Sequence, residues 1–165
     1  MRKPPPASSP PPPPVLPRAG QGMRGADGHL GYLLRQAGTA LRRRMELALA
    51  DLAVTPPQFT VMTMLAAYPG ASGADVARLA LLTPQTLTVI VANLERAGLV
   101  ARQADAAHGR IRRIALTAAG ERLLRACRAR VAGIEREMAA GLSAAEERAV
   151  RRWLARVAAA ADGAG

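Results

Sequence analysis

The segment SGADVARLALLTPQTLTVIVANLERAG, residues 72–98, has the pattern of two helices joined by a tight Leu-Leu link. Ser72 is placed to cap a short first helix, and Thr83 followed by Pro84 is placed to start a longer second one. Gly98 is a typical residue for the C-terminal end of that second helix. This spacing predicts a helix-turn-helix.

The second of these helices has two different faces. Its apolar face is expected to be buried and consists of Leu87, Ile90, Val91 and Leu94. The opposite face presents Gln85, Thr86, Thr88, Val89 and Asn93. In a DNA major groove a glutamine can bond adenine through two hydrogen bonds, a threonine can bond either base, and an apolar group can contact the thymine methyl. The free N–H groups at the start of a helix suit a phosphate.

We therefore take Ser72, Thr83, Pro84 and the five residues of the exposed face as candidate DNA contacts. The alternative is an ordinary pair of helices whose polar face meets water.

A short hairpin is expected directly after this pair. Residues 99–102 and 111–116 are strand candidates, and the loop between them holds Asp105 and Gly109. The expected tip is basic, and its candidate DNA contacts are His108, Arg110 and Arg112. Arginine is the residue that a narrow, electronegative minor groove attracts. The hairpin is thus predicted to be a DNA-binding wing, with a solvated charged hairpin as the alternative.

Helices are expected on both sides of this central part. Apolar residues recur at helical spacing at 30, 34, 37, 41, 45, 48 and 52. Thr55-Pro56-Pro57-Gln58 has the form of a capping box that opens a helix to about residue 67. Thr117 caps a helix with apolar positions 124, 127, 131, 134 and 138, and Ser143 opens a last helix with Val150, Trp153, Leu154 and Val157. The predicted fold is mainly α with a small β-hairpin wing, namely a winged helix-turn-helix with a helical dimerisation region.

The N-terminal segment has a different composition. Nine of the 13 prolines fall within the first 17 residues. Polyproline II is favoured there, with nothing to pack against. We expect residues 1–27 to be a disordered Pro-rich tail, followed by one folded domain over residues 28–162.

Composition supports a helical, basic protein. The chain has 165 residues, half of them hydrophobic and only 2% aromatic, so its core must be built from Ala, Leu and Val. Such a core favours helices over an all-β fold. The net charge is +11 and remains +8 without the predicted tail. An excess of this size indicates nucleic acid or another anionic partner, although an Arg- and Ala-rich coding bias could also raise the count.

Residues for catalysis or metal binding are sparse. Cys127 is the single cysteine, His29 and His108 are far apart, and no Gly-rich phosphate loop is present. We therefore expect no enzymatic activity, no cofactor and no metal site. A single cysteine cannot form a disulfide within the chain, which fits a protein in a reducing compartment. No apolar run reaches the roughly 18 residues of a membrane span, and the N-terminus does not have the pattern of a secretory signal. We expect a cytoplasmic protein with no membrane partner.

Two runs carry a family resemblance. TPQTLTVIVANLERAGLVAR, residues 83–102, and HGRIRRIALTAAGERLL, residues 108–124, resemble the multiple-antibiotic-resistance-regulator (MarR) family of winged-helix transcription factors. The resemblance extends over roughly residues 28–160. It implies a homodimer built by residues 28–53 and 118–162, with the winged helix-turn-helix in residues 55–117.

The resemblance also implies a function. Such dimers place their recognition helices in successive major grooves of a pseudo-palindromic operator and their wings in the flanking minor grooves. The chain is thus expected to be a transcriptional regulator that binds specific sequences of double-stranded DNA. It is expected to act as a repressor that leaves the DNA when it binds a small-molecule effector. The alternative is a dimeric interaction protein of the same fold that has lost specific DNA binding.

Two residues depart from the family pattern. His108 stands before Arg110 where the family wing usually has an Asp that pairs with the arginine. Val89 stands where many members have an arginine, which removes one guanine or phosphate contact. Replacement of Arg110 by alanine is expected to weaken DNA binding broadly, whereas Gln85→Ala is expected to change sequence preference.

A dimer is also expected from hydrophobicity. The first helix and the last two would each leave an apolar stripe exposed in a single chain. Pairing two chains buries these stripes and sets the recognition helices about 34–36 Å apart, one turn of DNA. The alternative is a monomer with an amphipathic surface helix.

The family resemblance implies small aromatic or phenolic effectors. The candidate pocket residues are Tyr32, Arg35 and Gln36 on the first helix and Phe59 and Met62 on the second. A Phe or Met at helical spacing can equally be a core residue. Cys127 falls on the buried stripe of its helix, so we favour a structural role for it over oxidation sensing.

Overall fold

The computed structural model describes residues 16–104 and 112–162, and the chain divides into two compact units, residues 1–41 and residues 42–165. The first unit contains a short 3-10 helix, Gly22–Arg24, and the beginning of α1 (Leu30–Leu49). The second unit contains the rest of the chain from residue 42 on, and each unit is described by itself.

In the first unit, the segment before α1 is held by side-chain hydrogen bonds. The Arg24 guanidinium donates to Gln36 Oε1 over 3.2 Å, and Gln36 Nε2 donates to the Arg24 carbonyl over 3.0 Å. The 3-10 turn lies inside the segment that the sequence predicts to be a disordered tail. Residues 22–24 therefore have regular local structure, while the proposed domain boundary at residue 28 remains a prediction.

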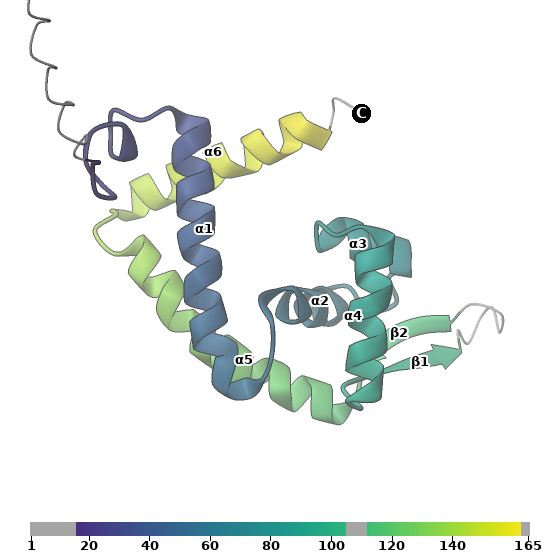
Figure 1. Cartoon of the computed structure of the whole chain (residues 1–165). Helices are drawn as coiled ribbons and strands as arrows, with labels where there is room; N and C mark the ends of the chain where they lie inside the picture. Colours follow the sequence, from purple (N-terminus) through teal and green to yellow (C-terminus); the bar gives the residue numbers. More distant parts are fainter. Residues whose placement is uncertain (1–15, 105–111, 163–165) are drawn as a thin grey trace, which may run out of the picture. The chain divides into compact units, whose positions relative to one another are not determined.

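The second unit is mainly helical with one antiparallel hairpin, as predicted (Figure 1). After α1 and a 3-10 turn, Ala50–Leu52, its elements are α2 (Pro56–Ala67), α3 (Gly73–Leu79), α4 (Pro84–Arg96), β1 (Val100–Ala104), β2 (Arg112–Leu116), α5 (Ala118–Ala139) and α6 (Ala144–Asp162). The order of elements is the expected one.

The predicted helix starts are capped by the predicted residues. At α2 the Thr55 hydroxyl accepts a hydrogen bond from the Gln58 N–H, and Gln58 Oε1 accepts one from the Thr55 N–H. Ser143 and Glu146 form the same reciprocal pair at α6. These contacts satisfy N–H groups that a helix start otherwise leaves without partners, so the capping boxes fix where these helices begin.

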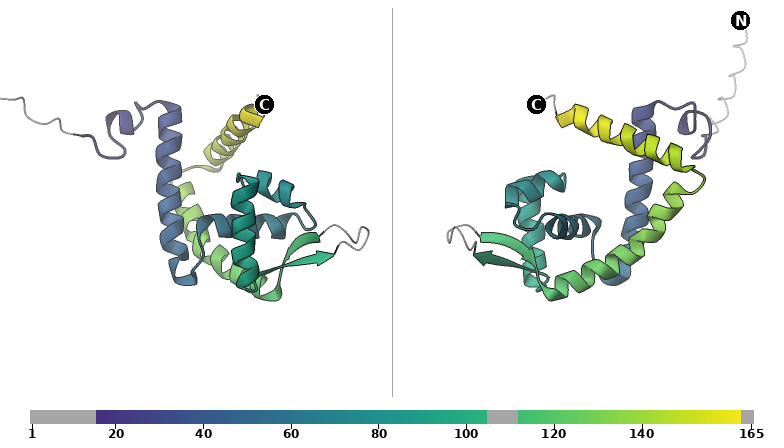
Figure 2. Two further views of the ribbon diagram at one scale, coloured as in Figure 1. Left: turned by 45° about the vertical axis from the view of Figure 1, so that its right-hand side comes forward. Right: turned by 180° about the vertical axis from the view of Figure 1, so that it is seen from behind.

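The core of this unit lies among α2, α3, α4, the hairpin and the first half of α5 (Figure 2). Its most deeply buried side chains are small or medium aliphatic groups with one thiol. They are Leu49, Val61, Met62, Val76, Val91, Leu94 and Cys127. The core thus has the aromatic-poor composition that the sequence predicts, and it fixes α3 and α4 on one side of the unit.

The hairpin is shifted relative to the sequence prediction. Val100 pairs with Leu116 and Gln103 pairs with Arg113 in antiparallel register. The sequence predicts that Leu99 belongs to the first strand. In the structure its N–H bonds to the Leu94 carbonyl and its own carbonyl accepts a hydrogen bond from the Thr117 N–H, so Leu99 belongs to the turn that follows α4. The first strand instead continues to residue 104, because β2 supplies partners that far.

The last two helices differ in how far they are covered. On α5 the apolar side chains Leu124, Cys127, Val131 and Ile134 are buried, whereas Met138 is exposed. None of the described side chains of α6 is buried, and Val150, Leu154 and Val157 are each more than 40% exposed. The expected apolar stripe is therefore present on α6, and within this unit it is uncovered.

Candidate nucleic-acid interface

The helices α3 and α4 form the predicted helix-turn-helix. Their axes turn by 105° across the short link, within the range of about 90–120° for this motif. Leu81 occupies the left-handed backbone region with φ of 55°, and its N–H bonds to the Arg78 carbonyl over 3.1 Å. The next N–H, that of Leu82, bonds to the Ala77 carbonyl over 2.9 Å. These two bonds fix the angle between the helices.

The start of α3 is held by Ser72 and Asp75. The Asp75 N–H donates to Ser72 Oγ over 3.2 Å, and the Ser72 hydroxyl donates to Asp75 Oδ2 over 2.6 Å. The hydrogen bond from the Ser72 side chain, followed by that from Arg78, holds the pKa of Asp75 below its ordinary value. The Ser72 hydroxyl is therefore occupied by the helix cap.

The start of α4 is built in a similar way. Thr83 Oγ1 accepts from the Thr86 N–H over 3.2 Å and shares a 2.9 Å hydrogen bond with Thr86 Oγ1. Pro84 occupies the first turn, where its missing N–H costs nothing. The Thr88 hydroxyl donates to the Pro84 carbonyl over 2.9 Å. The hydroxyl groups of Thr83, Thr86 and Thr88 thus also stabilise the first turn and a half of the helix.

The two faces of α4 are as predicted. Its buried residues are Leu87, Ile90, Val91 and Leu94. The opposite face carries five side chains that are all exposed to solvent, namely Gln85, Thr86, Thr88, Val89 and Asn93. The Asn93 side chain accepts a hydrogen bond from Arg96 over 2.9 Å. Within the described parts of the chain, the Gln85 side chain makes no hydrogen bond, and the side chain of Val89, one helical turn later, is 60% exposed.

We call these two residues the Gln85–Val89 pair. A glutamine amide that is free to rotate can offer a donor and an acceptor to one base, and a valine beside it offers an apolar surface. The pair is therefore the part of the α4 face that is most available for contacts with another molecule.

The wing is described only along its strands. His108 and Arg110, the candidates at the tip, lie outside the described residues, and Arg112 opens β2 opposite Ala104. Arg102 pairs with Glu95 at the end of α4 over 2.9 Å. Arg113 donates a hydrogen bond to the Gly70 carbonyl in the loop between α2 and α3. The strands are thus tied to α4 and to the loop that leads into α3.

The Arg113–Gly70 and Arg102–Glu95 contacts were not found from the sequence. Gly70 and Arg113 are 43 residues apart, and no local pattern relates a loop carbonyl to a strand arginine at such a distance. Glu95 and Arg102 lie on different elements, so helical spacing does not relate them either.

The candidate effector residues fall in different units. Tyr32 and Arg35 are exposed on α1, and the Gln36 side chain is occupied by Arg24. In the second unit Met62 is completely buried in the core, and Phe59 is half-buried against it. Met62 thus fits the core interpretation that the sequence left open, and an effector pocket formed by all five residues remains a prediction.

Cys127 has the environment of a structural cysteine. Its side chain is completely buried, and burial, with a smaller contribution from the charge of Asp51, raises the pKa of the thiol. A thiol with a raised pKa carries little of the reactive thiolate.

Two further features bear on function. Among the described side chains, no three His, Cys, Asp or Glu residues cluster as metal ligands would. No single described helix is both long and apolar enough to cross a membrane. The helices α3 and α4 reach the necessary length and hydropathy only when they are taken together, and they are bent by 105° relative to each other.

Comparison with known proteins identifies related transcriptional regulators. A family model described as the MarR family matches residues 54–111. The HTH-type transcriptional repressor Rv2887 of Mycobacterium tuberculosis is 39% identical over 128 residues, which are 78% of this chain and 92% of that protein.

Two solved structures of the M. tuberculosis MarR family protein Rv2887 are similar to this one. The complex with salicylic acid aligns with a TM-score of 0.64 at 38% identity and covers 80% of this chain and 98% of that chain. The complex with DNA aligns with a TM-score of 0.63 at 36% identity and covers 78% of this chain and 97% of that chain.

Proposed function

Because the chain belongs to the MarR family, we propose that it is a transcriptional regulator that binds specific sequences of double-stranded DNA as a homodimer. The observation that carries the proposal is the α3–α4 pair, which holds an exposed polar face on α4 at a helix-turn-helix angle of 105°. The DNA complex of the relative Rv2887 supports the same partner for this chain.

The contacts with DNA divide into two kinds. The Gln85–Val89 pair enters the major groove and contacts base edges, since these side chains are free for it. The capped start of α4, with Thr83 and Pro84, lies against a phosphate. The wing arginines, with Arg110 first, contact the minor groove and phosphates and supply much of the salt-dependent affinity.

The homodimer follows from the uncovered apolar face of α6. Val150, Leu154 and Val157 expose apolar surface along one side of this helix. Pairing with a second copy removes that surface from water, which stabilises by about 25 cal/mol for each Å² buried. A fixed dimer also sets the distance between the two α4 helices and hence the spacing of the two half-sites in DNA.

We further propose that the chain is a repressor that a small aromatic acid releases from DNA, acting in the cytoplasm, where the chromosome of a bacterial cell lies. The support is the relative Rv2887, which is named a transcriptional repressor and has been crystallised with salicylic acid. On the basis of its family membership we propose a regulatory role for the chain and no catalytic step.

Selection of bound sequences from a random duplex pool, at two salt concentrations, tests the main proposal. We expect enrichment of an inverted repeat whose halves are about 10 base pairs apart, and the motif persists at the higher salt. Binding without a motif that disappears at the higher salt would contradict specific recognition. That result would favour the alternative, an interaction protein of the same fold.

A further inference from the structure

Three exposed arginines lie in a row along α6. Arg148, Arg152 and Arg156 follow one another at intervals of four residues, and all three side chains are exposed. Residues four apart lie on the same side of a helix, about 6 Å from each other along its axis. The residues beside them on this side are the exposed alanines Ala149 and Ala155. We call the three arginines the α6 arginine row.

The row has no acidic neighbour to pair with. Among the described residues, none of its three side chains forms an ion pair or a hydrogen bond. Glu146 is occupied by the helix cap at Ser143, and Glu147 pairs with Arg151 over 2.7 Å. Like charges four residues apart on a helix repel one another and lower its stability. The uncompensated row therefore indicates an anionic partner outside the described chain.

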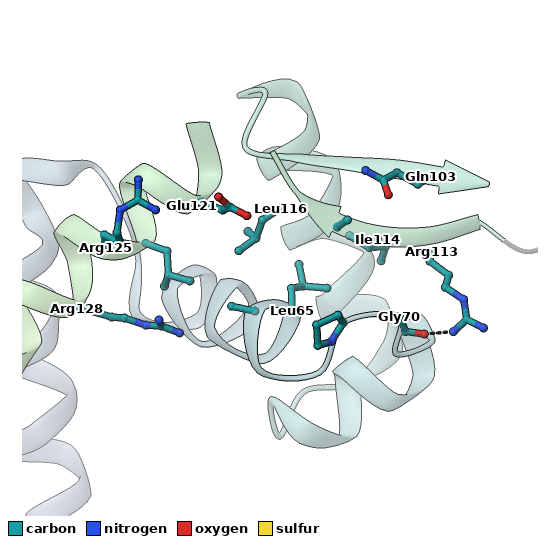
Figure 3. A pocket seen from close by; sticks show the side chains of 13 residues that line it. Leu65, Gly70, Gln103, Arg113, Ile114, Leu116, Glu121, Arg125 and Arg128 are labelled. Atoms are coloured by element: carbon teal, nitrogen blue, oxygen red, sulfur yellow. Dashed lines mark hydrogen bonds between the residues drawn. The ribbon is translucent and has the colours of Figure 1, made fainter. Parts of the chain in front are cut away.

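Other arginines of the second unit are placed differently. Arg113 donates a hydrogen bond to the Gly70 carbonyl, which Figure 3 shows as a dashed line. Arg125 and Arg128 line a cleft of about 690 Å³ between α2, β2 and α5 (Figure 3). The α6 arginine row lies outside this cleft, on an open helix face, where an extended partner can reach all three guanidinium groups at once.

The row lies on the side of α6 opposite its apolar stripe. The stripe consists of Val150, Trp153, Leu154 and Val157, and helical geometry places its centre roughly 150° around the axis from Arg152. In the proposed homodimer a second copy covers the stripe, so the row stays exposed. A membrane-binding helix needs its apolar face for the lipid, and here the dimer uses that face. The expected partner is thus a polyanion that is bound by charge alone.

Duplex DNA is the polyanion that fits a row of this kind. One of its strands carries a negative charge about every 3.4 Å along the helix axis, and the row extends over about 12 Å. A guanidinium group can bind phosphate oxygens through two parallel hydrogen bonds. We propose that the α6 arginine row binds the phosphate backbone of a second double-stranded DNA segment without sequence preference, so that one dimer connects two duplexes.

The position of α6 favours a second segment over the one that α4 contacts. The hairpin ends directly before α5 and α6 follows it, so the hairpin and α6 lie at opposite ends of this 22-residue helix (Figures 1 and 2). The connection of two duplexes rests on the proposed function, whereas binding of phosphates by the row does not.

The salt dependence of binding to a duplex without the selected motif tests the row itself. The triple variant Arg148→Gln/Arg152→Gln/Arg156→Gln of the full-length chain loses three phosphate contacts. We expect its slope of log affinity against log salt to be shallower than that of the parent by roughly 2–3, because each contact contributes about 0.9. An unchanged slope would overturn the proposal.

The matched control is Arg43→Gln/Arg122→Gln/Arg136→Gln, which removes the same charge from exposed positions of α1 and α5. These three arginines make no ion pair among the described residues and form no row. Both triple variants are expected to keep the melting temperature of the parent, and the control is expected to keep most of its salt slope. Equal slopes for the two triple variants would show that only total charge matters and would overturn the proposal.

Retention of a second duplex tests the connection. The protein is bound to an immobilised duplex that carries the selected inverted repeat, and a labelled duplex without the repeat is added. We expect the parent and the control to retain the labelled duplex, and the α6 triple variant to bind the repeat normally but to lose that retention. Equal retention by both triple variants would overturn the proposal.

Two further outcomes would also overturn it. A shallower salt slope without retention of a second duplex would place the row on the same DNA segment as α4. Binding of the parent to phosphatidylglycerol vesicles that the α6 variant loses, with retention of the second duplex unchanged, would assign the row to a membrane surface. If the parent shows no preference for the repeat, the proposed function fails, and the salt slope still tests the row.

Discussion

The hydroxyl of Thr117 donates a 2.7 Å hydrogen bond to the carbonyl of Gly98 and so joins the start of α5 to the end of α4. The same oxygen accepts a hydrogen bond from the Gly120 N–H over 3.1 Å as the N-cap of α5. The Thr117 N–H in turn bonds to the Leu99 carbonyl over 3.0 Å. One residue therefore holds the proposed recognition helix and the longest helix of the second unit together.

Replacement of Thr117 by alanine tests this junction. Loss of an N-cap hydroxyl costs about 1 kcal/mol, and the Gly98 carbonyl loses its donor as well. We expect the free energy of unfolding, measured by urea denaturation, to fall by roughly 1–2 kcal/mol. Thr117→Ser keeps the hydroxyl and is expected to restore most of the loss. Equal stability of the alanine variant and the parent would contradict the role of Thr117.

Even the smallest substitution of Gly120, by alanine, is expected to destabilise the fold. A Cβ atom at this position would lie 2.0 Å from the Leu99 carbonyl oxygen, and backbone cannot move aside as a flexible side chain can. We expect Gly120→Ala to destabilise the fold by about 1–3 kcal/mol.

Gly133→Ala, on the same helix, is the control for this substitution. Apart from its chain neighbours and the adjacent backbone of α5, no atom lies within 4 Å of the Cβ that it adds. Gly133→Ala is therefore expected to stabilise by up to about 1 kcal/mol through helix propensity. Similar melting temperatures for the two variants would show that the close approach at Gly120 is not rigid.

Replacement of Gln85 by alanine tests base recognition. The Gln85 amide has no intramolecular hydrogen bond in the described structure, so the substitution leaves the α4 cap intact. We expect the selected motif to lose preference at one base pair in each half-site, by about 1–3 kcal/mol, while the other positions stay unchanged. An identical motif from the parent and the variant would exclude Gln85 as a base contact.

Two capping carboxylates predict a pH dependence of stability. Hydrogen bonds from Ser72 and then Arg78 lower the pKa of Asp75, and hydrogen bonds from Ser143 lower that of Glu146. A group whose pKa is lower in the folded state stabilises above its unfolded pKa, here about 4, and this contribution is lost as the pH falls through the folded pKa.

The double variant Asp75→Asn/Glu146→Gln is therefore expected to lose less thermal stability than the parent between pH 6 and pH 3. Glu135→Gln is the control, because Glu135 makes no hydrogen bond or ion pair in the described chain. Parallel pH profiles for the parent and the double variant would contradict the assignment.

Local patterns were sufficient to predict most of the second unit. The pairs Thr55 with Gln58 and Ser143 with Glu146 fix helix starts within four residues of sequence, so chain spacing alone reveals them. The division of α4 into a buried and an exposed face likewise follows from helical periodicity, which holds wherever one side of a helix packs on a core.

Contacts between distant segments were not predictable in the same way. The bond from Arg113 to Gly70 and the cleft that both residues line depend on how α2, β2 and α5 pack. The sequence also does not reveal that Thr86, Thr88 and Asn93 are engaged in hydrogen bonds within α4. Of the five candidate residues on this face, only Gln85 and Val89 have side chains that make no hydrogen bond within the described structure.

We propose that a homodimer presents two α4 helices at a fixed distance to two half-sites of DNA. The most direct test is the affinity for the selected inverted repeat before and after insertion of about five base pairs, half a helical turn, between its halves. We expect the insertion to lower affinity by more than about a hundredfold, toward non-specific binding, because the second half-site rotates to the far side of the duplex. Unchanged affinity would contradict a dimer of fixed geometry that reads both halves.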